Sequence, residues 1–306
     1  MIPDYQTLMR PVLECARNEP RMISDVVDDI SDHFDLSGDE RRQLLPSGKQ
    51  TTIANRVHWA RSYLKQAGLV RNIRRGWYEL TERGKLALED PSISLDVKYL
   101  MQFTEFQDFR SRTKENDEIT QAETENDTLA YTPDEDLQAA HQKLDNALAA
   151  SLLEAVRSSS PAFFEQLIVD LFIAMGYGGT SEDAGRALGQ SGDNGVDGVI
   201  DQDPLGVDQI YLQAKRYGAT NSVGPAEIRD FFGALSLKKA SKGIFVTTSQ
   251  FSNAAQQTAK DLGTRIVLIN GAQLAKLMIK YNVGCREKEV LHIKQIDEGY
   301  FEEVTT

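Results

Sequence analysis

Cysteine, histidine and long apolar runs are all scarce in this chain of 306 residues. Its two cysteines, Cys15 and Cys285, stand near opposite ends, and its four histidines are scattered without metal-ligand spacing. A disulfide framework and a structural zinc site are therefore excluded. No apolar run approaches the roughly 18 residues that a membrane helix needs, and the first residues, MIPDYQTLMR, lack the apolar core of a signal peptide. The sequence predicts a soluble, cytoplasmic protein that has no membrane partner.

Charge is unevenly distributed along the chain, whose formal net charge is -12. From Lys49 to Lys85 there are nine Lys or Arg residues and two acids, a local balance of +7. From Thr113 to Asp145 there are two lysines and ten acids, a local balance of -8. Contacts with a polyanion depend on the local field, because charges are screened within about 10 Å at 0.1 M salt. The acidic total therefore does not exclude a DNA-binding face in the basic segment.

Residues 1–92 have the pattern of a winged helix-turn-helix domain. Apolar residues at helical spacing predict helices over Tyr5–Arg17, Met22–Phe34 and Thr51–Lys65. The next runs, Leu69–Ile73 and Trp77–Leu80, are expected to pair across a basic turn. Three helices followed by a hairpin predict a recognition helix for the DNA major groove and a wing for the backbone or minor groove.

Basic residues of the third helix and of the wing are the predicted DNA contacts, since they fall together where phosphates would be bound. They are Arg56, Arg61, Lys65, Arg71, Arg74 and Arg75. Two other interpretations stay open: a helix face that is simply solvated, and a winged helix that binds protein. Double-stranded DNA is the partner that the pattern favours.

Residues 93–160 are predicted to join this domain to the next. Between Thr113 and Asp136 the chain is rich in Glu, Asp, Asn and Thr and has few large apolar residues, so we expect a flexible linker. Val97–Phe109 and Leu137–Val156, on either side, have helical character. The acidity favours a solubilising role, and the alternative is that this segment competes with DNA for the basic wing.

Residues 161–285 are predicted to form an α/β domain, followed by a tail over residues 286–306. A helix is expected from Pro161, behind a run of serines that can cap it. Two short apolar strands then alternate with three helices: Pro225–Leu237, Gly243–Thr248, Asn253–Leu262, Arg265–Ile269 and Ala272–Tyr281. This alternation predicts a partly parallel sheet.

The stretch from Gly192 to Arg216 combines a glycine-broken turn with two β-like runs, Val196–Asp201 and Gln209–Lys215. A hairpin is predicted, and it would form the antiparallel side of a mixed sheet. Side chains alternate along a strand, so Gln213 and Lys215 share one face while Ile210, Leu212 and Ala214 share the other. If the apolar set faces the core, Gln213 and Lys215 stand together beside Asp197 of the neighbouring strand.

These residues resemble the core of PD-(D/E)xK nucleases, and specifically that of the Mrr family of restriction endonucleases. The resemblance rests on the segments GDNGVDG, YLQAKRY and GIFVTTSQFS, and on a preceding helix that carries Glu165. It covers most of the chain, because the catalytic domain runs from about Pro161 to Gly284 and the region before it is similar to the Mrr N-terminal winged helix. It implies an α/β restriction-endonuclease-like core in a hydrolase of type IV restriction character, directed at modified, methylated DNA.

The resemblance also implies metal-dependent hydrolysis of a DNA phosphodiester, with Mg²⁺ as the expected ion and Mn²⁺ as a substitute. Asp197, the side-chain carbonyl of Gln213 and the backbone carbonyl of Ala214 are then the expected metal ligands. Lys215 is expected to orient or deprotonate the attacking water and to offset charge on the phosphoryl oxygens. Glu165 is expected to bind the ion through water or to accept a proton.

Gln213 departs from the acidic residue that is usual in the wider superfamily. An amide removes one negative charge, which favours a single metal ion over two. Thr247, Thr248 and Ser249 lie at the carboxyl end of a buried strand, where a phosphate contact is one expectation. Capping of the next helix by Ser249 or Ser252 is the alternative.

Three functions stay open from the sequence: a restriction endonuclease for modified DNA, a non-catalytic DNA-binding or regulatory protein on a nuclease fold, and a repair or recombination nuclease. The intact set of Asp197, Gln213 and Lys215 favours the first. An enzyme with one active site per chain must pair to cut both strands, so we also expect a homodimer or a larger homo-oligomer.

Overall fold

The computed structural model describes residues 1–114, 131–178, 196–203, 207–297 and 300. The chain divides into two compact units, Met1–His141 and Gln142–His292, and the end of the chain from Ile293 is grouped with the first. Each unit has a hydrophobic core of its own. Within the described ranges, no helix combines the length and the hydrophobicity needed to cross a lipid bilayer.

The first unit packs helices against a small antiparallel sheet. Its elements are α1 (Met9–Cys15), β1 (Arg21–Met22), α2 (Ile23–His33), α3 (Gly38–Arg42), α4 (Thr52–Gln66), β2 (Val70–Arg74), β3 (Trp77–Leu80), α5 (Glu82–Glu89), α6 (Val97–Leu100), α7 (Thr104–Lys114) and the start of α8 (Pro133–Ser158). The strand order is β1-β3-β2. Helices α1, α2 and α4 and the β2–β3 hairpin lie where the sequence predicted three helices and a hairpin, and β1 adds a third strand that is too short to leave a pattern in the sequence.

Helix α4 is the predicted recognition helix. It begins where Thr51 caps it, through a hydrogen bond from the backbone N–H of Ala54 to Thr51 Oγ1 (3.4 Å). Its inner face buries Ile53, Val57 and Leu64 in the core of the unit. The wing, β2 and β3, follows, and its turn contains Gly76 at a φ of +72°, a left-handed backbone that favours glycine.

The core of the first unit extends beyond the domain boundary predicted at residue 92. Four residues of the segment that follows are buried in it: Leu95, Val97, Leu100 and Phe106. Most of the predicted flexible linker, residues 115–130, lies outside the described residues. Its last residues are helical instead, because Glu135 N donates to Thr132 Oγ1 (3.2 Å) and Thr132 N donates to Glu135 Oε2 (2.9 Å). This capping box starts α8 at Pro133.

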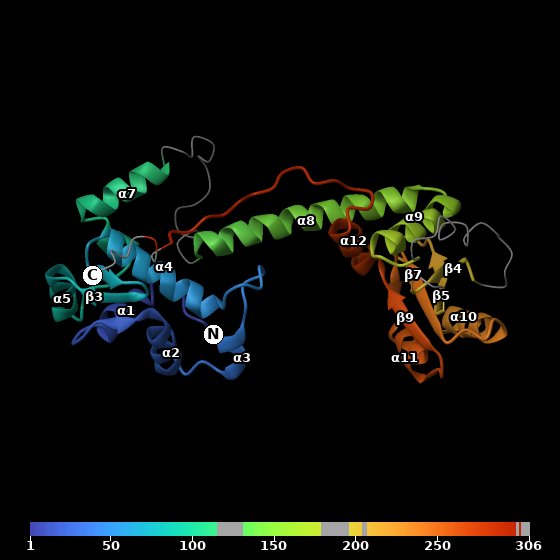
Figure 1. Ribbon diagram of the computed structural model, residues 1–306, viewed down its shortest axis with the longest axis horizontal. Helices are drawn as coiled ribbons and strands as arrows, with labels where there is room; N and C mark the ends of the chain where they lie inside the picture. Colours follow the sequence, from blue (N-terminus) through green and yellow to red (C-terminus); the bar gives the residue numbers. More distant parts are fainter. Residues whose placement is uncertain (115–130, 179–195, 204–206, 298–299, 301–306) are drawn as a thin grey trace. The chain divides into compact units, whose positions relative to one another are not determined.

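The second unit contains the predicted mixed sheet with helices on both faces (Figure 1). Its elements after α8 are α9 (Pro161–Ala174), β4 (Gly198–Asp201), β5 (Gln209–Lys215), β6 (Ser222–Val223), α10 (Pro225–Leu237), β7 (Lys242–Thr247), β8 (Gln250–Phe251), α11 (Asn253–Asp261), β9 (Arg265–Ile269) and α12 (Gly271–Lys280). The main sheet has the order β4-β5-β7-β9, in which β4 and β5 are antiparallel and the other pairs are parallel. Residues 286–297 of the predicted tail form no helix or strand.

The two faces of the main sheet have separate cores. Ile210 and Leu212 of β5 pack with α9, α12 and the end of α8, and Ala214 lies at the margin of that core. This confirms the predicted inward face of the strand. The opposite face is covered as well, by α10 and α11, with Phe231 and Phe245 in edge-to-face contact at 5.6 Å between ring centroids. Of the polar residues on that face of β5, Gln213 is therefore buried inside the domain, whereas Lys215 is half-buried and Gln209 is exposed.

Candidate active site

Asp197 lies directly before β4 and faces the last residues of β5. Its backbone N–H donates to the carbonyl of Leu212 (2.9 Å). Its side-chain Oδ2 then accepts a hydrogen bond from the backbone N–H of Ala214 (2.8 Å) and another from Gln213 Nε2. The pairing of β4 with β5 ends at Leu212. Beyond that residue, the Asp197 carboxylate takes the place of a neighbouring strand as the hydrogen-bond partner of β5.

Gln213 is buried, with 3% of its surface exposed, although it carries a polar amide. Its NH₂ group is satisfied by Asp197. A half-turn of the amide would instead present the Oε1 carbonyl to the space beside that carboxylate. The side chain can therefore offer either a donor or an oxygen ligand without leaving its position.

The backbone carbonyl of Ala214 shares this edge of β5. The N–H and C=O of one residue in a strand point to the same neighbouring strand. Since the Ala214 N–H points to Asp197, its carbonyl oxygen also points to the side where β4 pairing has ended. Asp197 and the carbonyl of Ala214 thus share this side of β5, and the Gln213 oxygen would face Asp197 after a half-turn of its amide.

Glu165 on α9 and Lys215 at the end of β5 complete the predicted set, and both are half-buried. Burial raises the pKa of the Glu165 carboxyl, the negative charge of Asp197 raises it further, and Lys215 opposes the increase. The three charged groups therefore act on one another across the end of β5. A cation near the two carboxylates would relieve their mutual repulsion.

The donor set consists of hard oxygens: two carboxylates, an amide and a backbone carbonyl. Such oxygens suit Mg²⁺, which prefers carboxylates and carbonyls and keeps several waters. In the described part of the chain, no group of three His, Cys, Asp or Glu residues could hold a metal ion. An ion at this site would therefore depend on the amide of Gln213 as well as on the acids. The motif residues 192–195 before Asp197 lie outside the described residues.

Thr247, Thr248 and Ser249, for which the sequence left a phosphate contact open, are buried with at most 1% exposure. Their hydroxyls bind the protein itself, as when Thr247 Oγ1 donates to the carbonyl of Lys215 (2.8 Å). Ser252, and not Ser249, caps α11 by accepting from Ala255 N (3.1 Å). These side chains are thus placed to support the end of β5 and not to meet a phosphate.

Arg56 differs from the other predicted DNA contacts. Its guanidinium pairs with Glu135 of α8 (Nη2 to Oε1 2.8 Å), and both side chains are only 12% exposed. It also donates to the backbone carbonyls of Ile2 and Pro3 (2.8 and 2.9 Å). Because all three nitrogens of the Arg56 guanidinium are hydrogen-bonded within the first unit, we leave Arg56 out of the proposed DNA-contacting set.

The remaining predicted contacts lie on α4 and on the wing. Arg61 is half-buried, whereas four are exposed: Lys65, Arg71, Arg74 and Arg75. Arg74 lies over the ring of Trp77, with Cζ 4.2 Å from the centroid, and Arg71 pairs with Glu79 on the adjacent strand (2.6 Å). The wing therefore presents its positive charge at the surface.

A buried polar network between α4 and the start of α8 has no counterpart in the sequence predictions. Asn55, 2% exposed, donates to Asp134 Oδ2 (2.7 Å) and accepts from Thr132 Oγ1 (2.7 Å). Trp59 Nε1 donates to the same carboxylate oxygen (3.0 Å). The segment Thr-Pro-Asp-Glu, a capping signature with proline in the first turn, is the signal that would have located this helix start.

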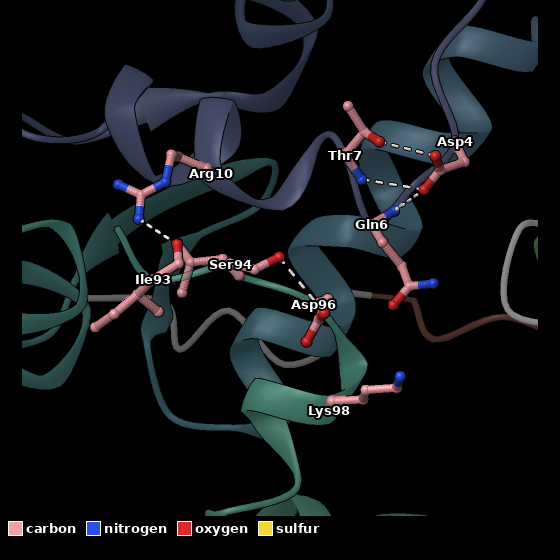
Figure 2. Close-up of a pocket in the computed structure, with 9 residues that line it drawn as sticks. Asp4, Gln6, Thr7, Arg10, Ile93, Ser94, Asp96 and Lys98 are labelled. Atoms are coloured by element: carbon pink, nitrogen blue, oxygen red, sulfur yellow. Dashed lines mark hydrogen bonds between the residues drawn. The ribbon is translucent and has the colours of Figure 1, made fainter. Parts of the chain in front are cut away.

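A cavity in the first unit, shown in Figure 2, is lined by charged residues that include Asp4, Arg10, Asp96 and Lys98. Arg10 donates to the carbonyl of Ile93 (2.7 Å), and Asp4 accepts from the backbone N–H groups of Gln6 and Thr7 (2.9 and 3.0 Å). These polar groups hold the chain's own backbone, which is a structural role. The site at the end of β5 is therefore the candidate for chemistry.

Comparison with known families gives two matches that cover most of the chain. A family model described as restriction endonuclease matches residues 156–278, and the model of the Mrr N-terminal domain matches residues 5–90. The chain is also 34% identical over 308 residues to the type IV methyl-directed restriction enzyme EcoKMrr of Escherichia coli (strain K12). That similarity covers 98% of this chain and 99% of the relative.

Two solved structures are similar to part of the chain. The DNA modification-dependent restriction endonuclease AspBHI is 22% identical, with a TM-score of 0.32, over 54% of this chain and 40% of that one. The MspJI restriction endonuclease in complex with a 27-mer oligonucleotide is 24% identical, with a TM-score of 0.29, over 54% and 37%.

Proposed function

Because the chain belongs to the Mrr family of restriction endonucleases, we propose that it hydrolyses phosphodiester bonds of methylated double-stranded DNA with the help of Mg²⁺. The Escherichia coli relative is a methyl-directed restriction enzyme, and its similarity to this chain spans both units. The observation that carries the proposal is the carboxylate of Asp197, which is bound to β5 between Gln213 and Lys215.

Restriction endonucleases generally depend on a divalent metal ion. We assign Asp197, the amide oxygen of Gln213 and the carbonyl of Ala214 as the ligands, with Glu165 bound directly or through water. When bound, the ion would supply positive charge against the scissile phosphate. The amide at position 213 lowers the negative charge of the site, which favours one ion over two.

The remaining chemistry falls to Lys215 and Glu165. In hydrolysis a water oxygen attacks phosphorus, the bond from phosphorus to the leaving oxygen breaks, and one proton passes from the water toward the leaving oxygen. We assign Lys215 to orient this water and to stabilise the negative charge that grows on the phosphoryl oxygens. We assign Glu165 to exchange the proton, because the pKa of its carboxyl is raised in the protein.

DNA is proposed to bind across α4 and the wing, through Arg61, Lys65, Arg71, Arg74 and Arg75. Exposed arginines at a wing tip can reach phosphates, and phosphate contacts fix the register of a protein on the duplex. Two copies of the chain are proposed to act together, since each chain carries one candidate site and a double-strand break needs two cuts. We propose the cytoplasm as the chain's location, where it would have access to cellular DNA.

Plasmid cleavage tests the proposal. Native protein is incubated with Mg²⁺ and matched methylated and unmethylated supercoiled plasmids, beside Lys215→Ala and a control, Lys242→Ala. Lys242 lies at the opposite end of the parallel strands and pairs with Asp208 (3.0 Å). We expect faster cleavage of the methylated plasmid, a loss of about 100-fold in Lys215→Ala, and native cleavage in Lys242→Ala. Equal cleavage by native protein and Lys215→Ala, or none by the native protein on either plasmid, would refute the assignment.

A further inference from the structure

The last three residues of β5 are held in the sheet from one side only. β4 pairs with Gln209–Leu212, whereas β7 pairs with β5 as far as Lys215, opposite Thr247. On the open side, the carboxylate of Asp197 accepts a hydrogen bond from the backbone N–H of Ala214. Among the hydrogen bonds of the described residues, this carboxylate makes none with the backbone of Lys215. The position of Lys215 therefore depends on what β7 supplies at this end.

Two groups at the end of β7 bind the carbonyl oxygen of Lys215. Thr247 Oγ1 donates to it at 2.8 Å, and the backbone N–H of Thr248 donates to it at 3.3 Å. Of the two, the hydroxyl makes the shorter bond. Thr247 is fully buried, so water does not compete for this bond.

Ser249 lies beside the Thr247 hydroxyl. A hydroxyl has one hydrogen, and Thr247 Oγ1 donates it to the carbonyl of Lys215. The backbone N–H of Ser249 donates to Thr247 Oγ1 (3.2 Å), and the Ser249 hydroxyl lies 3.0 Å from the same oxygen, a contact in which either hydroxyl could be the donor. The N–H of Ser249 therefore favours the orientation in which the Thr247 hydrogen points to Lys215.

The chain immediately after Lys215 is held in the same way. Thr248 Oγ1 donates to the carbonyl of Tyr217 (2.7 Å) and accepts from its N–H (2.8 Å). The carbonyl of Thr248 in turn accepts from Arg157 of α8 (2.6 Å from Nη2). Residues on both sides of Arg216 are therefore fixed by two buried threonine hydroxyls.

We infer that Thr247 is a positioning residue for the cleavage reaction: its hydroxyl holds the end of β5 so that the Lys215 side chain stays on the face of Gln213, beside Asp197. This rests on the role proposed above for Lys215. Thr247 itself has no exposed surface and touches no substrate. Its effect passes through the backbone of Lys215, and a displacement of about 1 Å at a reacting group can reduce a rate by about 100-fold.

The test compares Thr247→Val, which keeps the shape and removes the hydroxyl, with Thr247→Ser, which restores the hydroxyl. Thr258→Val is the matched control, because Thr258 also donates to a backbone carbonyl (Ala254, 2.8 Å) but lies on α11. Single-turnover cleavage at saturating DNA, DNA affinity without divalent ions, and melting temperature are measured for each full-length protein. Ser249→Ala, a smaller change that removes the hydroxyl beside Thr247 Oγ1, is measured as well.

Thr247→Val is expected to cleave at least about tenfold more slowly at saturating DNA, with unchanged DNA affinity. Thr247→Ser and Thr258→Val are expected to cleave at the native rate, and Ser249→Ala is expected to lie between the native protein and Thr247→Val. Native cleavage by Thr247→Val would overturn the inference. So would equal losses in the valine and serine variants, or a loss that disappears at temperatures where every variant is folded. If Lys215→Ala cleaves at the native rate, the assignment of Lys215 fails instead, whatever Thr247 does.

Discussion

Replacing Arg56 by alanine should destabilise the first unit and leave DNA binding intact, although Arg56 is a basic residue on the predicted recognition helix. The substitution removes a cation that is 12% exposed and leaves the equally buried Glu135 carboxylate without its guanidinium. It also removes the donors to Ile2 and Pro3. Breaking one side of a buried pair costs about 3 kcal/mol or more. For a unit of this size the melting temperature should fall by roughly 10 °C.

Tryptophan fluorescence during thermal unfolding measures this change, because both tryptophans, Trp59 and Trp77, lie in the first unit. The control is Arg42→Ala, which breaks an exposed pair with Asp39 and should change the free energy of unfolding by less than about 1 kcal/mol. DNA affinity is then measured at several salt concentrations at a temperature where every variant is folded. Arg56→Ala should keep the native affinity and the native slope of log affinity against log salt. Native stability combined with a weaker, less salt-dependent affinity would refute the reasoning.

Two further predictions concern the wing and the candidate site. Arg74→Ala should weaken binding of every DNA sequence alike and reduce the salt slope by about 1, because it removes one phosphate contact; an unchanged slope in a fluorescence anisotropy titration would exclude the wing tip from the interface. Glu165→Gln should change how stability depends on pH in the absence of divalent ions. Burial and Asp197 raise the pKa of Glu165 in the folded protein, so the folded state binds the proton more tightly than the unfolded chain. The stability of the native protein relative to Glu165→Gln should then fall as pH rises above 4.5, and a difference that stays constant in melting series across pH would contradict this.

The shared face of Gln213 and Lys215 was predictable from local pattern because both residues lie on one strand. The alternation along Gln209–Lys215 placed Ile210 and Leu212 in a core, and so put Gln213 and Lys215 together on the other face. The pattern did not predict that helices α10 and α11 cover this second face, since alternating residues look alike whether the polar face meets water or another helix. The burial of Gln213 and the supporting role of Thr247 result from the packing of these two helices on that face.

The intramolecular partners of Arg56 were not predicted, for a different reason. A basic residue on the outer side of a helix gives the same sequence pattern whether it faces solvent or another segment of the chain. Its partner, Glu135, is 79 residues away, and the intervening acidic stretch has no periodicity that would bring the two together. Strand β1 was missed for a related reason, because two residues are too few to show alternation.

The buried contact between Asn55 and Thr132 defines how the N-terminal module would have to be cut for transfer to another protein. A fragment that ends at residue 92 would lose Phe106 from its core and would expose Asn55, Arg56 and Trp59 to water. Its new surface would carry a cation and an amide that the full chain keeps inside. A graft that joins this proposed DNA-binding unit to a different cleavage domain should therefore extend through the first turns of α8, to about His141.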